Sequence, residues 1–480
     1  MNTVDFFGKL KAKGIKGTAE SIARRLNPPP DNKYTILLLT NRDSDNVGDQ
    51  VIEACDISLI RAVMKNLNIP EEIYKINSRA ASLVTQKYMA TRDPALLQGA
   101  ENTIANCDMI VFGGAPLFNY QYQNFYERTA VTLELAQKYH KPVIFSAIGV
   151  EGYDEDDEKC QRLKKTLNFD CVKQITTRDH YDLLEKYRTN ESIHIQKVSD
   201  PAVFSKKVFE PFLEEKVSDP ERKKKIGVFV LRSNGFRDNG VDFTRKQAAT
   251  LWTDLSTELK KRDYDFEFLT SGHFGDEALL DHLIRKYGFT EKQTVFNINC
   301  PEDLLQKIYS YDGVIACRLH PSIISYALQV PAIGIVWNKK VTGFYNNVGY
   351  GERTVPVEGI NPQALLDQLE TVMSEGVSYD KEYLLTVYTT LFQGIKKALN
   401  LTDTDATPYT FEELWDNLPP YKGTTPGELN DKIRRKFRRT YGGYNGLFGS
   451  VGPLKKKVAE LSEELEQYRD PNARDDSSNE

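Results

Sequence analysis

The chain has 480 residues, of which 40% are hydrophobic and 27% are charged, and its formal net charge is −5. This composition is typical of a soluble globular protein with room for two or three domains. The acidic balance excludes binding that depends on bulk positive charge, so we expect no nucleic acid partner. We find no run of the roughly 18 apolar residues that span a bilayer and no signal peptide, and we expect a cytoplasmic protein.

The cysteines and histidines give no pattern of a metal or disulfide site. No cysteine stands in a C-x-x-C pair, and the histidines other than His320 show no metal-binding spacing. We therefore expect free thiols in a reducing compartment and no metal. The cysteines are Cys55, Cys107, Cys160, Cys171, Cys300 and Cys317.

The first half of the chain alternates strands with helices. Residues 1–30 form a basic, loosely amphipathic segment that ends in three prolines. Residues 31–218 then alternate apolar, strand-like runs with helical stretches, which indicates βαβ units and a parallel sheet. The predicted strands are 34–40, 107–115 with a glycine turn, 141–149, 171–177 and 193–198, and the predicted helices are 49–67 and 125–140.

A second series follows a linker. The charged, proline-containing stretch 205–225 breaks the pattern, and strands alternate with helices again over 219–400. Residues 401–480 are polar and basic, and we expect a helical and partly disordered extension there. The predicted fold class is α/β, with two domains of similar size. The predicted strands of the second domain are 226–232, 264–270, 294–298, 313–317 and 331–337, with a helix over 245–262.

The stretch CRLHPSIISYALQVPAIGIVWNKKV, residues 317–341, places cations at the ends of two neighbouring strands. Arg318 and His320 follow the first strand, and Lys340 follows the second. Ligands of parallel sheets bind beyond the carboxyl ends of the strands, and a helix start there favours an anion. No Asp or Glu occurs over 313–351, so we expect a site for a small, highly charged anion. The alternative is that acids from elsewhere in the chain neutralise Arg318 and Lys340.

This stretch resembles the signature of the polysaccharide pyruvyltransferase family, which has an R-x-H at a strand end, a small-residue helix, a P-x-I-x-I strand and a Lys-Val pair. Four other stretches resemble motifs of the same family in the same order. They are NVGDQVIEA (46–54), FGGAPLF (112–118), TRDHYDLLEK (177–186) and SDPAVF (199–204). The sequence departs from the family at Ala115, where a third glycine is usual, and at WNKKV, where many relatives have an aspartate and a proline.

The resemblance implies a fold and a reaction. The fold is two Rossmann-like domains of the glycosyltransferase type B kind that face each other across a cleft, with the acceptor on the N-terminal side and the donor on the C-terminal side. The reaction is transfer of pyruvate from phosphoenolpyruvate to a sugar of a cell-surface polysaccharide or its lipid-linked precursor, as a ketal. Phosphoenolpyruvate is a substrate here, so no cofactor is expected.

The resemblance also assigns residues to the donor. It places Arg318, Leu319 and His320 against phosphoenolpyruvate, with Arg178 and Lys340 holding its anionic groups. The reaction needs a proton on the methylene carbon, and His320 is the predicted acid because the usual histidine pKa of about 6.5 lies near working pH. Arginine and lysine would stabilise the leaving phosphate. A salt bridge with nearby acids is the alternative for Arg178.

Three further residues each have two open interpretations, and a fourth residue has a structural one. Asp49 either serves the acceptor hydroxyl as a base or orienter, or caps the helix that begins near residue 50, and the cap is favoured. Gly113 and Gly114 either turn the backbone under a ligand or form a plain strand-to-helix turn. Asp200 is predicted to shape an Asp-Pro turn near the domain junction.

Two other functions stay open. A sugar-nucleotide glycosyltransferase of the same fold commonly has an acid near the helix starts of its second domain, and the acid-free stretch 313–351 argues against it. An inactive protein that keeps the fold is argued against by the retained Arg318, His320 and Lys340.

Positive charge gathers in two stretches, 9–25 and 432–457, and aromatic residues are interleaved with them or lie beside them. Such stretches suit the anionic inner face of a plasma membrane, and a lipid-linked acceptor would give this contact a purpose. Solvated tails are the alternative.

Overall fold

The chain forms two compact units, residues 1–423 and residues 424–480. The computed structural model describes residues 33–121, 124–215, 221–401 and 404–469. The basic segment predicted over 1–30 lies outside the described residues.

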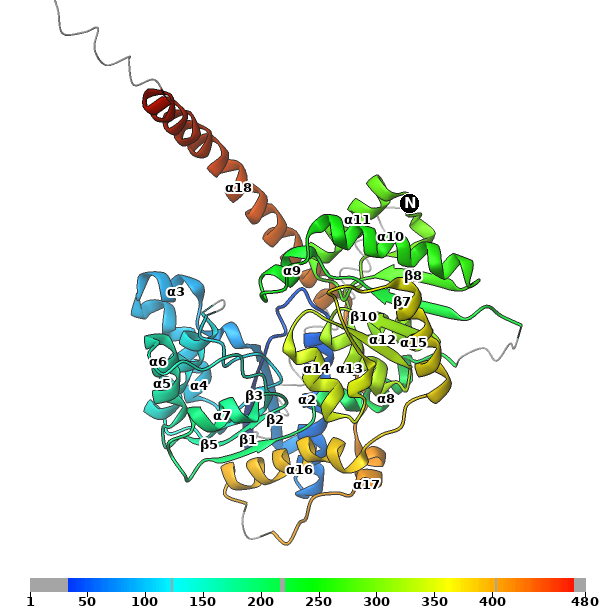
Figure 1. Cartoon of the computed structure of the whole chain (residues 1–480). Helices are drawn as coiled ribbons and strands as arrows, with labels where there is room; N and C mark the ends of the chain where they lie inside the picture. Colours follow the sequence, from blue (N-terminus) through cyan, green and yellow to red (C-terminus); the bar gives the residue numbers. More distant parts are fainter. Residues whose placement is uncertain (1–32, 122–123, 216–220, 402–403, 470–480) are drawn as a thin grey trace, which may run out of the picture. The chain divides into compact units, whose positions relative to one another are not determined.

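The first domain is built on a six-stranded parallel sheet with the strand order β2-β1-β3-β4-β5-β6 (Figure 1). The five strands predicted for this domain are confirmed. The strands are β1 (Tyr34–Thr40), β2 (Tyr74–Ala80), β3 (Met109–Gly113), β4 (Val143–Ile148), β5 (Val172–Thr177) and β6 (His194–Lys197). The helices are α2 (Gly48–Asn66), α3 (Gln86–Thr91), α4 (Gln98–Ala105), α5 (Phe125–Lys138), α6 (Glu158–Leu167), α7 (Tyr181–Tyr187), η4 (Pro201–Phe204) and α8 (Ser205–Val208).

The second domain repeats this plan, with the strand order β12-β11-β10-β7-β8-β9. Its predicted strands are confirmed, although β9 is shorter than expected. The strands are β7 (Lys225–Phe229), β8 (Asp265–Leu269), β9 (Thr294–Val295), β10 (Gly313–Ala316), β11 (Ala332–Val336) and β12 (Thr354–Pro356). The helices are α9 (Ser233–Arg237), α10 (Arg245–Lys261), α11 (Phe274–Tyr287), α12 (Pro301–Tyr309), α13 (Leu319–Ala327), α14 (Lys339–Asn347) and α15 (Pro362–Glu375).

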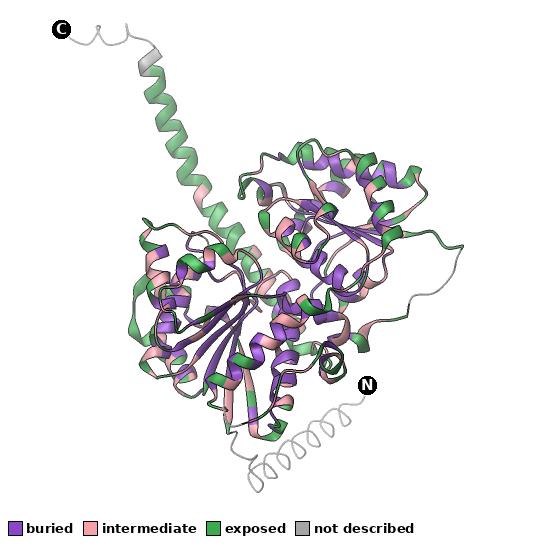
Figure 2. Ribbon diagram, turned by 60° about the horizontal axis from the view of Figure 1, so that its bottom comes forward, coloured by how far each residue is buried: buried purple, intermediate pink, exposed green. Residues whose placement is uncertain are grey.

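The burial of each strand explains whether the sequence analysis predicted it. The central strands β1, β3, β4 and β10 are buried almost throughout, because helices cover both faces of each sheet (Figure 2), and such strands are continuous apolar runs. The strands β2 and β12 were not predicted. Both lie at a sheet edge and are only partly buried, so their sequences YKINSRA and TVP carry polar residues and no clear strand signal.

The chain returns to the first domain after the second one is complete. Helix α16 (Lys381–Ala398) packs on α2, β4 and β5, and Gln174 of β5 donates to the carbonyl of Thr390 at 3.0 Å. Helix α17 (Phe411–Asn417) follows, and Phe411, Leu414 and Leu418 are buried in the same apolar cluster as α2. The structure therefore moves two predicted boundaries. Residues 381–398 belong to the first domain and not to a domain over 219–400, and the extension predicted from 401 begins with packed structure.

The second unit contains helix α18 (Pro426–Arg469), which is 44 residues long. It includes the predicted basic stretch 432–457 and continues through Pro453. Its large exposed hydrophobic residues are Phe437, Tyr441, Tyr444, Leu447, Phe448, Val451, Leu454, Val458, Leu461 and Leu465.

The packing of α17 makes a prediction about stability. Replacing the fully buried Leu414 with alanine leaves a cavity in the core, and we expect the free energy of unfolding to fall by about 2–4 kcal/mol. Asp416→Ala on the exposed side of the same helix is the control and should change it by less than about 0.5 kcal/mol. Denaturant unfolding measures both. Equal stabilities of the two variants would show that residues 411–418 do not contribute to the core.

Candidate active site

The turn after β10 positions three of the predicted residues. Arg318 is the N-cap residue of α13 in an extended conformation, and Leu319 and His320 form the first turn of this helix. His320 is only 7% exposed, although it lies near the surface of its own domain, because the first domain covers it.

His320 lies against the N-V-G-D motif of the first domain. The side-chain amide of Asn46 is 2.9 Å from His320 Nδ1. Gly48 leaves room for the ring, because a Cβ atom at this position would overlap His320 Cβ, Cγ and Nδ1. The backbone N–H of Val47 also donates to the carbonyl of Ser271 at 2.7 Å. Two motifs that are 274 residues apart are therefore parts of one contact between the domains.

These contacts select one tautomer of His320. Asn46 Oδ1 accepts a hydrogen bond from the N–H of Gly48 at 3.3 Å, so Asn46 Nδ2 faces the imidazole. An amide NH2 group only donates, so Nδ1 accepts and the proton of the neutral ring is on Nε2. This Nε2 lies 3.9 Å from Asp49 Oδ1, and it has no hydrogen-bond partner among the described residues.

The pKa of His320 is lowered to about 3, first by burial and then by the positive charges of Arg178 and Arg318. This lowered pKa contradicts the prediction that the imidazole titrates near working pH. A neutral His320 can donate a hydrogen bond from Nε2, whereas proton donation would require a bound anion that offsets the two guanidinium groups.

Arg318 and Lys340 are paired with acids from distant parts of the chain, so the expectation of an unneutralised cluster is wrong. Arg318 Nε and Nη2 lie 2.9 and 2.8 Å from Asp276 Oδ2, in the first turn of α11. Lys340 Nζ forms an ion pair with Glu151, which follows β4. The alternative that the sequence left open, pairing with acids from elsewhere, holds for both cations.

Lys340 reaches from α14 into the space between the domains. Its side chain is 14% exposed, and burial lowers its pKa to about 8, against the opposing effect of the charge of Asp49. The ammonium group is therefore charged at neutral pH and loses its proton on modest alkalinisation.

Arg178, at the end of β5, forms a buried ion pair with Asp200. Asp200 also accepts from the N–H of Ala202 at 2.8 Å and caps η4, in agreement with the predicted Asp-Pro turn. Burial would lower the pKa of Arg178, but Asp200, Asp179 and Asp49 outweigh it and raise the pKa. Arg178 Nε has no hydrogen-bond partner among the described residues, so this cation keeps one donor for a ligand.

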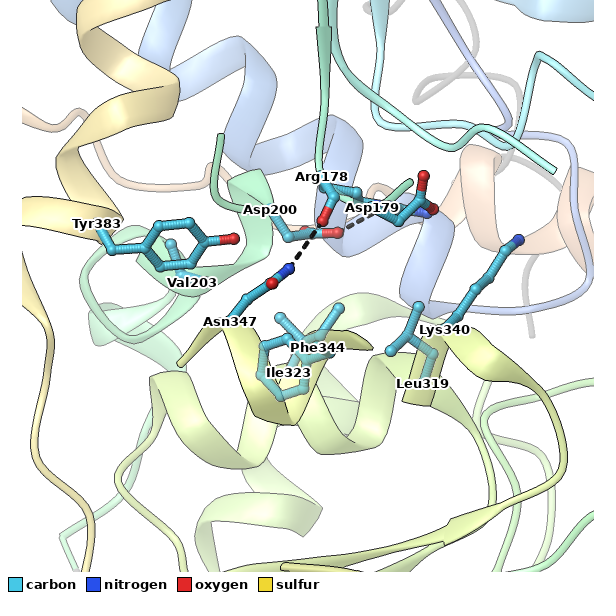
Figure 3. A pocket seen from close by; sticks show the side chains of 10 residues that line it. All are labelled: Arg178, Asp179, Asp200, Val203, Leu319, Ile323, Lys340, Phe344, Asn347 and Tyr383. Atoms are coloured by element: carbon cyan, nitrogen blue, oxygen red, sulfur yellow. Dashed lines mark hydrogen bonds and ion pairs between the residues drawn. The ribbon is translucent and has the colours of Figure 1, made fainter. Parts of the chain in front are cut away.

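A pocket between the two domains brings several of these side chains together (Figure 3). Its cavity volume is about 20 Å³, which is enough for about one water molecule. Arg178, Leu319 and Lys340 line it. The predicted site residues that do not line it are Arg318, His320, Asp49, Gly113 and Gly114. The other lining residues are Asp179, Asp200, Val203, Ile323, Phe344, Asn347 and Tyr383.

Asn347 and Asp179 are two polar residues among the lining residues that the sequence reasoning missed. Asn347 of α14 donates to the carbonyl of Arg178 at 3.2 Å and accepts from Lys197 Nζ at 2.6 Å, so it ties the second domain to the ends of β5 and β6. Asp179 directly follows Arg178, and its place in the stretch TRDHYDLLEK was the available signal. Asn347 has no comparable signal, because it lies beyond the recognised signature.

The remaining predicted residues, Asp49, Gly113 and Gly114, have contacts outside the pocket lining. Asp49 is the second residue of α2, whose N-cap residue is Val47; Asp49 Oδ2 accepts from Asn41 Nδ2 at 3.1 Å. A Cβ on Gly113 would overlap Asp56, and one on Gly114 would overlap Ile52. The glycines therefore let the end of β3 press against α2, which is a packing role. Among the described residues, no cluster of His, Cys, Asp and Glu is arranged to hold a metal ion, and all six cysteines are free and buried.

Comparisons with known proteins agree with this architecture. A family model described as polysaccharide pyruvyl transferase matches residues 18–339. No curated protein matches the chain significantly. A putative UDP-N-acetylglucosamine 2-epimerase from Listeria monocytogenes is similar in structure, with a TM-score of 0.51 and 11% identity over 78% of this chain and 99% of that one. The UDP-GlcNAc 2-epimerase of Methanocaldococcus jannaschii gives a TM-score of 0.47 and 13% identity over 75% and 98% of the two chains. At such identities the likeness concerns the fold alone, which is of the glycosyltransferase type B kind.

The contact between Gly48 and His320 can be tested directly. Gly48→Ala forces the ring away from Asn46, and we expect a loss of stability of about 1–3 kcal/mol from overpacking. The ¹⁵N chemical shifts of the His320 ring should also change, because Nδ1 loses its donor. Gly99→Ala is the control, since a Cβ there meets nothing within 4 Å. Unchanged shifts in Gly48→Ala would rule out this contact as the source of the tautomer.

Proposed function

Because the chain belongs to the polysaccharide pyruvyl transferase family, we propose that it transfers pyruvate from phosphoenolpyruvate to a sugar of a cell-surface polysaccharide or its lipid-linked precursor. The products are a pyruvate ketal and phosphate. The observation that carries the proposal is the pocket between the domains, where Arg178 and Lys340 line one small space and each also has an acidic partner. Guanidinium and ammonium groups suit the carboxylate and phosphate of this donor. The donor is a substrate, and the proposal includes no cofactor.

Donor binding requires the walls of this pocket to separate. The cavity of about 20 Å³ is too small for phosphoenolpyruvate. The contacts that hold it closed include the ion pair of Lys340 with Glu151 and the hydrogen bond of Lys197 with Asn347. An anionic group of the donor would replace Glu151 at Lys340, so one ion pair is exchanged for another. Opening and closing of the domains therefore belong to the proposed cycle.

The donor-binding roles follow from position. We assign Arg178, through its free Nε, and Lys340 to the anionic groups of the donor, and Leu319 to the apolar wall. His320 donates a hydrogen bond from Nε2 once the domains separate enough for a donor oxygen to reach it. Arg318 acts from behind, because its pairing with Asp276 fixes a positive charge that keeps His320 neutral.

The acceptor is proposed to bind on the side of the first domain. Asp49 is the residue there that faces both the Nε2 of His320 and the charge of Lys340. We therefore assign its carboxylate the role of orienting a sugar hydroxyl toward the donor. The family supports a polysaccharide acceptor, and the lipid-linked form is part of the proposal.

A sugar-nucleotide glycosyltransferase is the second candidate. The acid-free stretch no longer argues against it, because Asp276 lies at a helix start of the second domain and contacts Arg318. Asp276 is fully buried and already paired, however, so it offers no free carboxylate to a ribose. Thermal unfolding with phosphoenolpyruvate and with nucleotide sugars separates the two, because only the true donor raises the melting temperature.

The role of Lys340 can be measured by calorimetry. Lys340→Gln removes one charged contact, and we expect phosphoenolpyruvate binding to weaken by about 2 kcal/mol, or about thirtyfold. In the unmodified protein the affinity should fall as the pH rises above about 8, because Lys340 loses its proton, and the variant should lack this fall. Lys339→Gln is the control, since Lys339 is exposed. An affinity and pH dependence in Lys340→Gln that equal those of the control would remove Lys340 from the donor site.

Peripheral attachment to the inner face of the plasma membrane is a separate proposal. In the described part of the chain, no helix is both long enough and apolar enough to cross a bilayer. Helix α18 instead carries exposed aromatic residues beside basic ones, including Phe437, Tyr441, Tyr444 and Phe448. Each lysine or arginine near an anionic leaflet contributes about 1 kcal/mol.

Flotation with liposomes tests this attachment. We expect the full chain to float with anionic vesicles at low salt, and a chain shortened to residues 31–425 to stay in the soluble fraction. Phe448→Asp should weaken the binding of the full chain, whereas Asn445→Asp, which adds the same charge at an exposed position of α18, should weaken it less. A full chain that stays soluble with anionic vesicles would remove the membrane from the proposal and leave the pyruvyl transfer standing.

A further inference from the structure

Two carboxyl groups line the pocket between the domains, and only one of them is fully occupied. Asp200 accepts from Ala202 through Oδ1 and from Arg178 through Oδ2. Asp179 accepts through Oδ1 alone, from the N–H of Val150 at 2.8 Å and from Thr177 Oγ1 at 3.1 Å. Its Oδ2 is buried and has no hydrogen-bond partner among the described residues.

We propose that Asp179 is the acid that protonates the methylene carbon of phosphoenolpyruvate; this inference rests on the proposed function. Two contacts hold Oδ1, and Asp179 lines the pocket together with Arg178 and Lys340 (Figure 3). The chain approaches Asp179 closely at Gly149, where a Cβ would come within 3.3 Å of Oδ2. The carboxyl group is therefore fixed in one orientation beside the two cations assigned to the donor.

The surroundings of Asp179 raise its pKa above the usual value of an aspartate. Burial raises its pKa, and the positive charge of Arg178, two hydrogen bonds and His180 only partly offset this effect. The other titratable groups that line the same pocket are Arg178, Asp200, Lys340 of α14 and Tyr383 of α16. A bound donor would offset the positive charge of Arg178, and this would raise the pKa of Asp179 further.

His320 is less suited to this step. Its Nδ1 faces Asn46, its ring is not on the pocket wall, and its pKa is lowered to about 3. Asp179 and His320 therefore have different roles. The carboxyl group of Asp179 donates a proton, and the imidazole of His320 donates a hydrogen bond.

The proposed steps balance. The proton on Asp179 Oδ2 moves to the methylene carbon, whose double-bond electrons form the new C–H bond and leave positive charge on the central carbon. A sugar hydroxyl oxygen bonds to this carbon, and its proton returns to Asp179. The bond from the central carbon to the phosphate oxygen then breaks, with the electron pair leaving on phosphate. The second hydroxyl closes the ketal, and its proton leaves with the phosphate.

The test uses the full-length protein, phosphoenolpyruvate and a lipid-linked glycan extract as the acceptor source. In Asp179→Asn, we expect calorimetric affinity for phosphoenolpyruvate to stay within about threefold of the unmodified protein, because no positive charge is lost. Phosphate release should fall by 100-fold or more. Asp182→Asn, an exposed neighbour in α7, is the matched control and should keep its activity.

The pH profile gives a second measurement. Activity of the unmodified protein should fall as the pH rises through the pKa of Asp179, because only the protonated acid donates, and Asp179→Glu should shift this alkaline limb. If Asp179→Asn does not fold, the alkaline limb of the Asp179→Glu profile tests the inference alone. Normal turnover in Asp179→Asn, or an unshifted limb in Asp179→Glu, would overturn the inference while the proposed function stands. An unmodified protein that neither binds phosphoenolpyruvate nor releases phosphate would overturn both.

Discussion

The fit of the His320 ring over the backbone of Gly48 is the contact on which the cleft depends. It needs a missing side chain on one domain and a flat, neutral ring on the other. Because Asn46 occupies Nδ1 of this ring, the contact also decides which nitrogen carries the proton. The tautomer, the burial of the ring and the spacing of the two domains are therefore consequences of one local fit.

Charge balance in the cleft is achieved across the fold and not within the sequence motifs. Arg178, Arg318 and Lys340 each have an acidic partner from another segment, namely Asp200, Asp276 and Glu151. Isolated charges are costly to bury, and the three cations are accordingly held in ion pairs. The pair with Glu151 differs from the other two because both of its partners are partly exposed. Exchange of partners is easiest there, which fits a lysine that must meet a ligand.

The sequence predicted the architecture well because the central strands are apolar on both faces. We did not predict the edge strands β2 and β12, because they lack a clear pattern of apolar residues. We also did not predict that α16 returns to the first domain, because this return leaves the local pattern of apolar residues unchanged. For the site, the motifs identified Arg178, Leu319 and Lys340, which line the pocket. The acids Asp276 and Glu151 and the bridge made by Asn347 depend on packing between distant segments, and no local spacing encodes them.

The return of the chain through α16 has a mechanical consequence. The polypeptide crosses between the domains twice, once before β7 and once between α15 and α16. Two covalent crossings define a hinge axis. They restrict twisting and sliding of one domain over the other. The remaining freedom is rotation about the line that joins the crossings. Residues far from this line travel furthest for a given angle, so a small rotation at the two crossings becomes a large displacement far from them.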